Sequence, residues 1–385
     1  MRILYVISEL TLGGAQKQLV EIARELAQSG HEVAIYTLNR EVPRRAELSG
    51  SGVTLIVDQK RTRLDLRVLW RLRRTIDRMR PSVIHSFLFD ADIYARLAAV
   101  GTGIPVLNSE RSHNYVLPPL SLAAHRLTRR LVDGVVANSV SGRKFARELF
   151  RMDAADVHVV WNGIRMEELE RQAASQLDYR AQFFGPGEFR VACLVGSIKP
   201  AKDYELALAA ADELVTSHRE WRVLLVGDQL SAVTAYRPGR DADSGNYKAQ
   251  VLRRYETLAG RERIRFAGLR IDVPAILRQC DLLYISSHHE GSPNVVLEAM
   301  ALGIPVASTE YSDIRRVLPF PQQVAGERTA QSLTQSMLWA YRNREAVAAA
   351  QKNWVGAHAR IEQVALEMER VYRKYVDAQV SVQPA

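Results

Sequence analysis

The sequence predicts an α/β protein made of two Rossmann-like, doubly wound parallel-sheet domains with a cleft between them. Short apolar segments alternate with longer helical segments along the chain, a pattern typical of a parallel sheet covered by helices. The alternation stops near residue 163 and restarts near residue 191. A chain of 385 residues is long enough for two domains of ordinary size.

The first half opens with a strand, a glycine-containing loop and a helix. We expect the strand at Ile3–Ser8 and the helix at Gly13–Ser29, which ends before Gly30. Further strands are predicted at Glu32–Thr37, Thr54–Val57, Val83–Ser86, Val106–Ser109 and Val135–Asn138. These elements assign residues 1–170 to the first domain.

The second half repeats this opening after a polar segment, Met166–Glu188. Its predicted strands are Val191–Gly196, Arg222–Val226, Ile264–Phe266, Leu282–Ser286 and Pro305–Ser308. They assign residues 171–361 to the second domain. A long charged segment, Ile361–Asp377, predicts a last helix, and we expect this helix, about 362–380, to join the first domain.

The composition excludes several classes of protein. The hydrophobic fraction is 47% and the charged fraction 25%, which are ordinary values for a globular protein and argue against disorder. No apolar run approaches the ~18 residues of a spanning helix, and the N-terminus resembles a strand more than a signal peptide. Two cysteines, Cys193 and Cys280, make no disulfide framework. We therefore expect a cytoplasmic protein, and its net charge of +9 favours an anionic partner.

Arginine is concentrated between residues 61 and 80, which contain eight Arg and two Asp. Arg63, Arg67, Arg71, Arg74 and Arg78 follow helical spacing beside an apolar stripe. Two interpretations of this arginine stripe stay open. It binds an anionic membrane surface, at about 1 kcal/mol per basic residue, at the inner face of the membrane, or it is the solvated face of a helix. We expect no nucleic-acid partner, since neither a zinc-finger spacing nor an aromatic RNA-binding strand motif occurs.

The richest pattern lies between residues 286 and 305. After a strand, Ser292 is a suitable N-cap, Pro293 a suitable first helical residue, and Gly303 a suitable terminator. We therefore expect a short helix over Pro293–Leu302. Its free N-terminal amides would form a site for an anion such as a phosphate or diphosphate.

Two glutamates flank this expected anion site. Glu290 precedes the helix, and Glu298 shares one helical face with Asn294. Carboxylates repel phosphate, so we expect them to accept hydrogen bonds from sugar hydroxyls on either side of it. The alternative is that both are surface charges near the start of a helix.

The run EGSPNVVLEAMALGIPVAS resembles the E-x7-E signature of the family-4 retaining glycosyltransferases, with Glu290 and Glu298 at the two glutamate positions. Other segments resemble the motifs of this family in the expected order. They are Leu12–Gln16, Val83–His85, Ala137–Ser139, Trp161–Gly163, Val195–Asp203, Leu224–Asp228 and Arg265–Pro274. The resemblance implies the GT-B fold, in which two Rossmann-like domains face each other across a donor cleft.

The resemblance also implies roles for single residues. The first domain would hold the acceptor, and the second a nucleotide-sugar donor. Glu298 would bind the ribose hydroxyls and Glu290 the transferred sugar, while Lys202 would be the cation beside the diphosphate. Gly13 and Gly14 would let the backbone of the first loop approach the same phosphates. The diphosphate would lie on the loop and helix start formed by Gly291, Ser292, Pro293, Asn294 and Val295.

These roles imply a metal-independent reaction with retained anomeric configuration. A lysine and a helix N-terminus stabilise negative charge on the departing diphosphate without a metal. One departure from the family bears on this point. Ser197 stands where the family usually has arginine, so either Lys199 supplies the missing charge or Lys202 acts alone.

A second departure concerns the first domain. The histidine that the family usually has after the strand ending at residue 109 is absent: Glu110 or Arg111 stands there, and His113 follows slightly later. We expect Arg111 to contact the sugar or the phosphate. Glu110 and His113 are candidates for the acceptor side, together with His85, which either lines the site or is structural.

The resemblance thus implies a retaining glycosyltransferase. It would move a sugar from a UDP- or GDP-sugar, a substrate and not a cofactor, to a glycan or lipid-linked acceptor in cell-surface polysaccharide synthesis. Asp90-Ala-Asp92 and Asp241-Ala-Asp243 resemble a metal-binding DxD by spacing alone, so we expect no metal. The alternative is a catalytically silent sugar-nucleotide-binding or scaffold protein of the same fold.

Overall fold

The computed structural model describes residues 1–62, 65–112, 117–228 and 242–380. The chain divides into two compact units. The N-terminal unit is Met1–Arg165 together with the stretch from His358 onward, and the C-terminal unit is Met166–Ala357. The boundaries therefore lie a few residues before the sequence positions assigned above, 170 and 361.

The N-terminal unit contains a seven-stranded parallel sheet in the order β3-β2-β1-β4-β5-β6-β7. Its central strands are buried on both faces, as continuous Val/Ile/Leu runs predict. The strands are β1 Arg2–Ile7, β2 Glu32–Thr37, β3 Thr54–Val57, β4 Val83–Phe87, β5 Val106–Glu110, β6 Gly134–Ala137 and β7 Val157–Val159.

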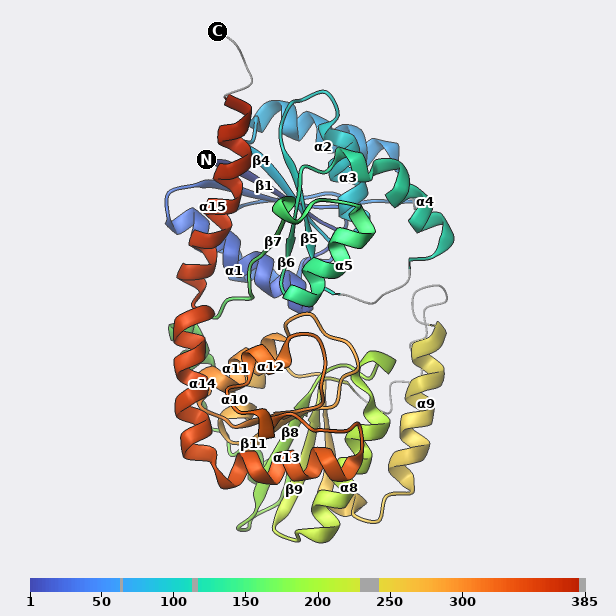
Figure 1. Cartoon of the computed structure of the whole chain (residues 1–385), viewed down its shortest axis with the longest axis vertical. Coiled ribbons are helices and arrows are strands. Elements are labelled where there is room, and N and C mark those ends of the chain that lie inside the picture. Colours follow the sequence, from blue (N-terminus) through green and yellow to red (C-terminus); the bar gives the residue numbers. More distant parts are fainter. Residues whose placement is uncertain (63–64, 113–116, 229–241, 381–385) are drawn as a thin grey trace. The chain divides into compact units, whose positions relative to one another are not determined.

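Helices cover both faces of this sheet (Figure 1). α1 (Gly14–Gln28) and α15 (Ile361–Val380) lie side by side on one face, and α2 (Leu66–Met79) and α3 (Phe89–Ala99) pack on the other. The last helix thus completes the first unit. Shorter elements fill the remaining connections: η1 Pro43–Leu48, α4 Pro119–Thr128, η2 Arg129–Leu131, α5 Val140–Phe150 and η3 Ala154–Asp156.

The C-terminal unit contains a five-stranded parallel sheet in the order β10-β9-β8-β11-β12. The strands are β8 Arg190–Val195, β9 Trp221–Val226, β10 Ile264–Gly268, β11 Leu282–Ile285 and β12 Val306–Ser308. The helices are α6 Met166–Ala173, α7 Tyr179–Phe184, η4 Pro200–Lys202, α8 Tyr204–Ser217, α9 Ala242–Glu256, η6 Arg261–Arg263, α10 Val273–Arg278, α11 Asn294–Leu302, α12 Ile314–Val317, η7 Pro321–Gln323, α13 Ala330–Arg342 and α14 Arg344–His358. Side chains of α8, α9 and α13 share one hydrophobic core with the sheet.

The structure confirms the α/β class with two parallel sheets and corrects two local predictions, the end of the strand with His85 and the start of α11. The polar segment 166–188 contains α6 and α7, because Leu169, Ala173 and Tyr179 anchor them in the core. The strand with His85 continues to Phe87, which is fully buried. No helix in the described part of the chain is both long and apolar enough to cross a membrane.

The second correction concerns the start of α11. The helix begins at Asn294, and Pro293 is the N-cap with an extended ψ of 124°, so Ser292 is not the cap and Pro293 is not the first helical residue. The amide of Val296 donates to the Pro293 carbonyl at 3.1 Å. Gly303 ends the helix in the left-handed conformation, φ 76°, as predicted.

Candidate functional site

Two loops of the C-terminal unit meet at the carboxyl edge of its sheet. One follows β8 (residues 196–203), and the other follows the neighbouring strand β11 (residues 286–293). Hydrogen bonds join them: the amide of His288 donates to the Ala201 carbonyl at 2.8 Å, and the Ser286 hydroxyl donates to the Lys202 carbonyl at 2.7 Å. In open parallel sheets, ligands bind outside this edge.

Lys202 and Glu290, two residues that the sequence places in the site, form an ion pair between these loops. The Ser287 hydroxyl donates a further hydrogen bond to Oε1 of Glu290 at 3.0 Å. The Lys202 side chain is 23% exposed and the Glu290 side chain 17%. A cation and a carboxylate are thus held together, within reach of a ligand.

The backbone beside Lys202 is built from closely packed glycines. Gly227, at the end of β9, has φ +129°, and a Cβ there would lie 2.6 Å from the Gly196 carbonyl oxygen. A Cβ on Gly196 would lie 3.1 Å from Cε of Lys202. The two glycines therefore let neighbouring strand ends approach each other and let the lysine chain lie across residue 196.

Arg328 is a residue of this edge that the sequence did not indicate. Its guanidinium donates to the carbonyl oxygens of Ser287 at 2.9 Å and Ser286 at 2.8 Å, and to the Asp203 carboxylate at 2.7 Å. The Asp203 carboxylate also pairs with Nε2 of His288 at 3.0 Å. Arg328 thus fixes the backbone from which Glu290 projects. No local sequence pattern identifies Arg328 as a residue of this site, because it donates hydrogen bonds to backbone carbonyls of a distant loop.

α11 carries the second glutamate. Glu298 is 6% exposed, which disfavours the interpretation as a plain surface charge. Gly291, Ser292, Pro293, Asn294 and Val295 are all partly exposed.

The loop after β8 holds Ser197, at the position of the missing arginine, and Lys199, the candidate for its charge. Lys199 is exposed and forms the N-cap of η4, while Ser197 is partly buried. The amide of Ile198 donates to the Asp228 carboxylate at 3.3 Å, and Lys248 bonds the same carboxylate at 3.0 Å. The loop is therefore tied to the end of β9, with Lys199 on its exposed side.

In the N-terminal unit, Gly13 and Gly14 form the start of α1. Gly13 is the N-cap, has no capping side chain, and any Cβ on it would collide with the side chain of Gln16. Gln16 in turn donates to the Thr11 hydroxyl at 3.1 Å. The end of the Gln16 side chain therefore packs against Gly13 at the start of α1.

Arg111 lies directly after β5, at the carboxyl edge of the N-terminal sheet. Its Nη1 donates to Oδ1 of Asn162 at 3.0 Å, and its guanidinium lies 4.8 Å from the centroid of the Phe87 ring. Nε and Nη2 are buried and have no hydrogen-bond partner among the described residues. Burial lowers the pKa of Arg111 to about 10. An incompletely paired guanidinium of this kind favours an anionic or hydroxyl-bearing ligand.

The remaining candidates of this unit are placed differently. Glu110 is 6% exposed and accepts a hydrogen bond from the Ser112 amide at 3.1 Å. His113 lies outside the described residues. His85 is fully buried within β4, and its ring nitrogens bond the hydroxyls of Tyr372 at 2.7 Å and Ser109 at 2.9 Å. Burial lowers its pKa well below the ordinary value. Of the two roles open for His85, this placement favours the structural one.

The two Asp-x-Asp segments show no arrangement of metal ligands among the described residues. Asp92 is buried and accepts hydrogen bonds from Ser86 and Asn108, whereas Asp90 pairs with Lys60. No three His, Cys, Asp or Glu side chains of the described residues gather as a metal site requires. Asp241 lies outside the described residues, and metal independence stays a prediction.

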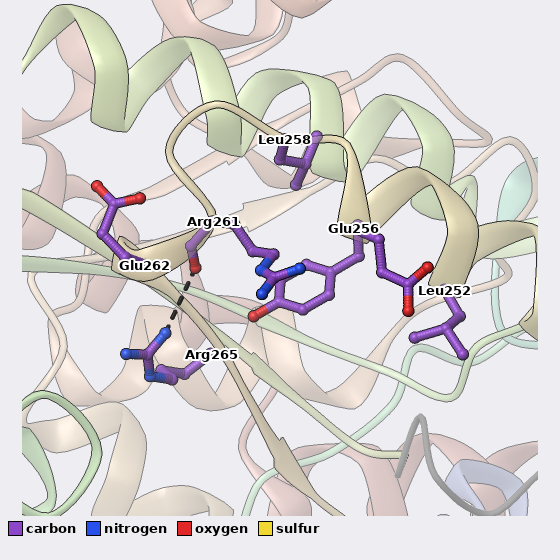
Figure 2. A pocket seen from close by; sticks show the side chains of 7 residues that line it. Leu252, Glu256, Leu258, Arg261, Glu262 and Arg265 are labelled. Atoms are coloured by element: carbon purple, nitrogen blue, oxygen red, sulfur yellow. Dashed lines mark hydrogen bonds between the residues drawn. The ribbon is translucent and has the colours of Figure 1, made fainter.

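A separate surface pocket lies at the other edge of the C-terminal sheet (Figure 2). It is lined by Leu252, Tyr255, Glu256, Leu258, Arg261, Glu262 and Arg265, at the end of α9 and the beginning of β10. Arg265 there donates to the Arg261 carbonyl at 3.4 Å. Because the strands are parallel, this pocket lies at the amino edge, away from Lys202 and Glu290. It is not the site predicted from the sequence.

Comparison with known proteins identifies the family. Residues 12–168 match the model of Glycosyltransferase Family 4, and residues 175–354 match Glycosyl transferases group 1. A D-inositol 3-phosphate glycosyltransferase of Thermobispora bispora is 25% identical over 328 residues, covering 79% of this chain and 75% of the relative. A UDP-Gal:alpha-D-GlcNAc-diphosphoundecaprenol alpha-1,3-galactosyltransferase of Escherichia coli is 22% identical over 254 residues, covering 63% and 61%.

Solved structures show the same fold. Anabaena Alr3699/HepE in complex with UDP superimposes with a TM-score of 0.78 at 18% identity, covering 97% of this chain and 100% of that one. A glycosyltransferase from Rickettsia africae gives a TM-score of 0.80 at 16% identity, covering 97% and 98%. With two parallel-sheet units and family matches over most of its length, the chain belongs to the family-4 glycosyltransferases and has the GT-B fold.

Proposed function

We propose that this glycosyltransferase moves a sugar from a UDP- or GDP-sugar to a glycan or lipid-linked acceptor with retention of configuration. The observation that carries the proposal is the Lys202–Glu290 ion pair beside the start of α11. It presents a cation and a carboxylate at the edge where parallel sheets bind ligands. The nucleotide sugar is the substrate, and the reaction needs no metal or other cofactor.

The chemistry of the leaving group explains why a lysine belongs here. When the glycosidic C–O bond breaks, negative charge develops on the diphosphate and positive charge on the sugar. The Lys202 ammonium has three N–H donors, so it can keep Glu290 and also bind a phosphate oxygen. Backbone amides at the start of α11 would add hydrogen bonds to the same diphosphate.

The two glutamates would then hold the hydroxyls on either side of the diphosphate. Glu290, fixed by Lys202 and Ser287, would accept hydrogen bonds from the transferred sugar. Glu298, buried within α11, would accept those of the ribose. Gly13 and Gly14 would approach the phosphates by their backbone.

Arg111 would act from the N-terminal unit. The N–H groups of Nε and Nη2, which have no partner among the described residues, suit a phosphate or a sugar hydroxyl, and Arg111 is the residue proposed to take the place of the missing family histidine. Glu110 and His113 are proposed for the acceptor side.

The names of related proteins support the donor and acceptor classes. Anabaena Alr3699/HepE is solved with UDP and with UDP-glucose, which favours a uridine donor. The E. coli relative acts on a diphosphoundecaprenol-linked acceptor by its name. A Salmonella typhi protein of Vi polysaccharide biosynthesis is 28% identical over 187 residues, although this is 46% of the chain and 28% of that protein. We therefore propose a role in cell-surface polysaccharide synthesis.

We also propose that the enzyme is cytoplasmic and works at the inner face of the membrane, which the arginine stripe would contact. In α2 the apolar residues Val68, Leu72 and Ile76 are buried, so the arginines do lie on the outer side. Arg71 is neutralised by Asp58 at 2.6 Å. Arg63 lies outside the described residues.

Turnover of a donor panel tests the proposed function. UDP-, GDP- and ADP-sugars are offered with and without glycan and lipid-linked acceptors, and nucleotide release and product configuration are measured. We expect acceptor-dependent release from a UDP- or GDP-sugar without added metal. If no donor turns over although one binds, the departures at Ser197 and Arg111 have made the chain a silent sugar-nucleotide-binding scaffold.

A further inference from the structure

A second basic surface of the N-terminal unit lies on α4 and η2, away from the arginine stripe. Two hydrogen bonds hold α4 on the unit: Nε2 of His125 bonds the Leu149 carbonyl at 3.1 Å, and Nη1 of Arg96 bonds the Thr128 hydroxyl at 3.1 Å. His125 and Thr128 are the buried residues of the helix. α4 lies beside α3 (Figure 1). The side of α4 opposite His125 and Thr128 therefore faces outward.

Two leucines of α4 and one of η2 are exposed. Leu127 is 83% exposed, Leu120 is 64% exposed and Leu131 is 36% exposed. Leu120 and Leu127 are seven residues apart, so they share one face of α4. Large apolar side chains exposed together on a fixed helix favour contact with an apolar phase.

Arg126 and Arg130 directly precede Leu127 and Leu131 in the chain, and both arginines are exposed. Desolvation, followed by the like charges of Arg151, Arg130 and Arg126, lowers the pKa of Arg129. Residues 117–132 contain no Asp or Glu. Burial and the charge of Arg96 lower the pKa of His125 to about 4, so this histidine adds no charge at neutral pH.

We propose that Leu120, Leu127 and Leu131 with Arg126, Arg129, Arg130 and Arg151, called here the α4 surface, dock on an anionic lipid surface. The leucines would enter the boundary between headgroups and acyl chains, and the arginines would bind lipid phosphates, as in helices that lie in the plane of a membrane. An acidic protein would pair with the arginines and leave the leucines in water, so lipid fits both features better.

The α4 surface differs from the arginine stripe in its counter-ions. In the arginine stripe, Arg71 pairs with Asp58 at 2.6 Å. On the α4 surface the charges that act on Arg129 are all positive. The inference refines the inner-face location and rests on that part of the proposed function, but not on the donor site.

Vesicle sedimentation of the full chain tests the proposal. Phosphatidylcholine vesicles with and without phosphatidylglycerol are compared for the wild type and for the variant Arg126→Gln/Arg129→Gln/Arg130→Gln. We expect binding to the anionic vesicles only, weakened on the order of 100-fold in the variant, since three charges at about 1 kcal/mol each are lost. Leu127→Ser, at a largely exposed position, should weaken the same binding with no change in charge.

Two control variants identify the surface. Arg253→Gln/Arg254→Gln/Arg342→Gln removes the same charge from exposed positions of the C-terminal unit and should bind vesicles like the wild type. Arg67→Gln/Arg74→Gln/Arg78→Gln removes exposed charge from the arginine stripe. If this stripe variant loses binding while the α4 variants keep it, the α4 surface is refuted but the inner-face location survives. Equal loss in the C-terminal control, or no vesicle binding by the wild type, also refutes the proposal.

Discussion

The Lys202–Glu290 ion pair gives the sharpest prediction, because the two residues should act as one unit. Lys202→Ala removes the ammonium and leaves the Glu290 carboxylate with the Ser287 hydroxyl as a donor. We expect turnover to fall at least ~100-fold, about 2.7 kcal/mol of transition-state stabilisation. Glu290→Ala should cost a similar amount, since it also releases the lysine from its fixed position.

The size of the coupling follows from the structure. Two unit charges in contact attract by about 4 kcal/mol at an effective dielectric near 20. Exposures of 23% and 17% screen part of this, so we expect a coupling near 2 kcal/mol in a double-mutant cycle. The double variant should therefore be only slightly slower than the slower single variant.

Initial rates of nucleotide release measure the cycle, and thermal unfolding checks that each variant is folded. Arg180→Ala is a matched control: it breaks the Arg180–Asp281 ion pair of 3.3 Å, also partly buried, at the amino edge of the same sheet, and should keep its turnover. The reasoning is refuted if either single variant keeps more than about a tenth of the wild-type rate. It is also refuted if the losses of the two single variants simply multiply.

Three further predictions concern the frame of the two units. Gly227→Ala should lower the free energy of unfolding by about 2 kcal/mol or more, because a Cβ at φ +129° meets the Gly196 carbonyl; urea unfolding that is unchanged would contradict this. Burial raises the pKa of Asp92 to about 6, so on raising the pH the unfolded chain loses this proton before the folded one does. The free energy of unfolding should therefore fall by roughly 3 kcal/mol as the pH rises from 4 to 6. Asp92→Asn should lack this pH dependence in urea titrations, and an unchanged pH dependence would contradict the raised pKa of Asp92. Arg328→Ala should weaken UDP binding about 10-fold or more, because it frees two loop carbonyls; calorimetry showing wild-type affinity would exclude that role.

Much of the fold follows from local pattern. The strands of both sheets are short continuous apolar runs, and Glu32–Thr37 and Thr54–Val57 are observed with the predicted bounds. The loop after β11 and α11 could be predicted because Glu290, Asn294 and Glu298 follow one another in the chain. A site built from one strand, one loop and one helix is visible in sequence.

What sequence could not predict depends on contacts between distant residues. His85 bonds Tyr372, which is 287 positions away, so its burial in the core has no local sign. Arg328 reaches carbonyl oxygens 41 and 42 positions away. At α11, Ser292 satisfied the general preference for an N-cap, but Pro293 keeps an extended ψ and takes that position. Local preference was outweighed there by the geometry of the loop.

The most direct test of the account is calorimetric titration of UDP and GDP into the wild type and Glu298→Ala. Glu298 is buried in α11 and is proposed to bind the ribose. A nucleotide held there should bind the wild type and lose at least ~10-fold in affinity in the variant, since a charged hydrogen-bond acceptor is removed. Equal affinity in the two proteins, with both folded, would show that the nucleotide binds elsewhere and would contradict the proposed donor site.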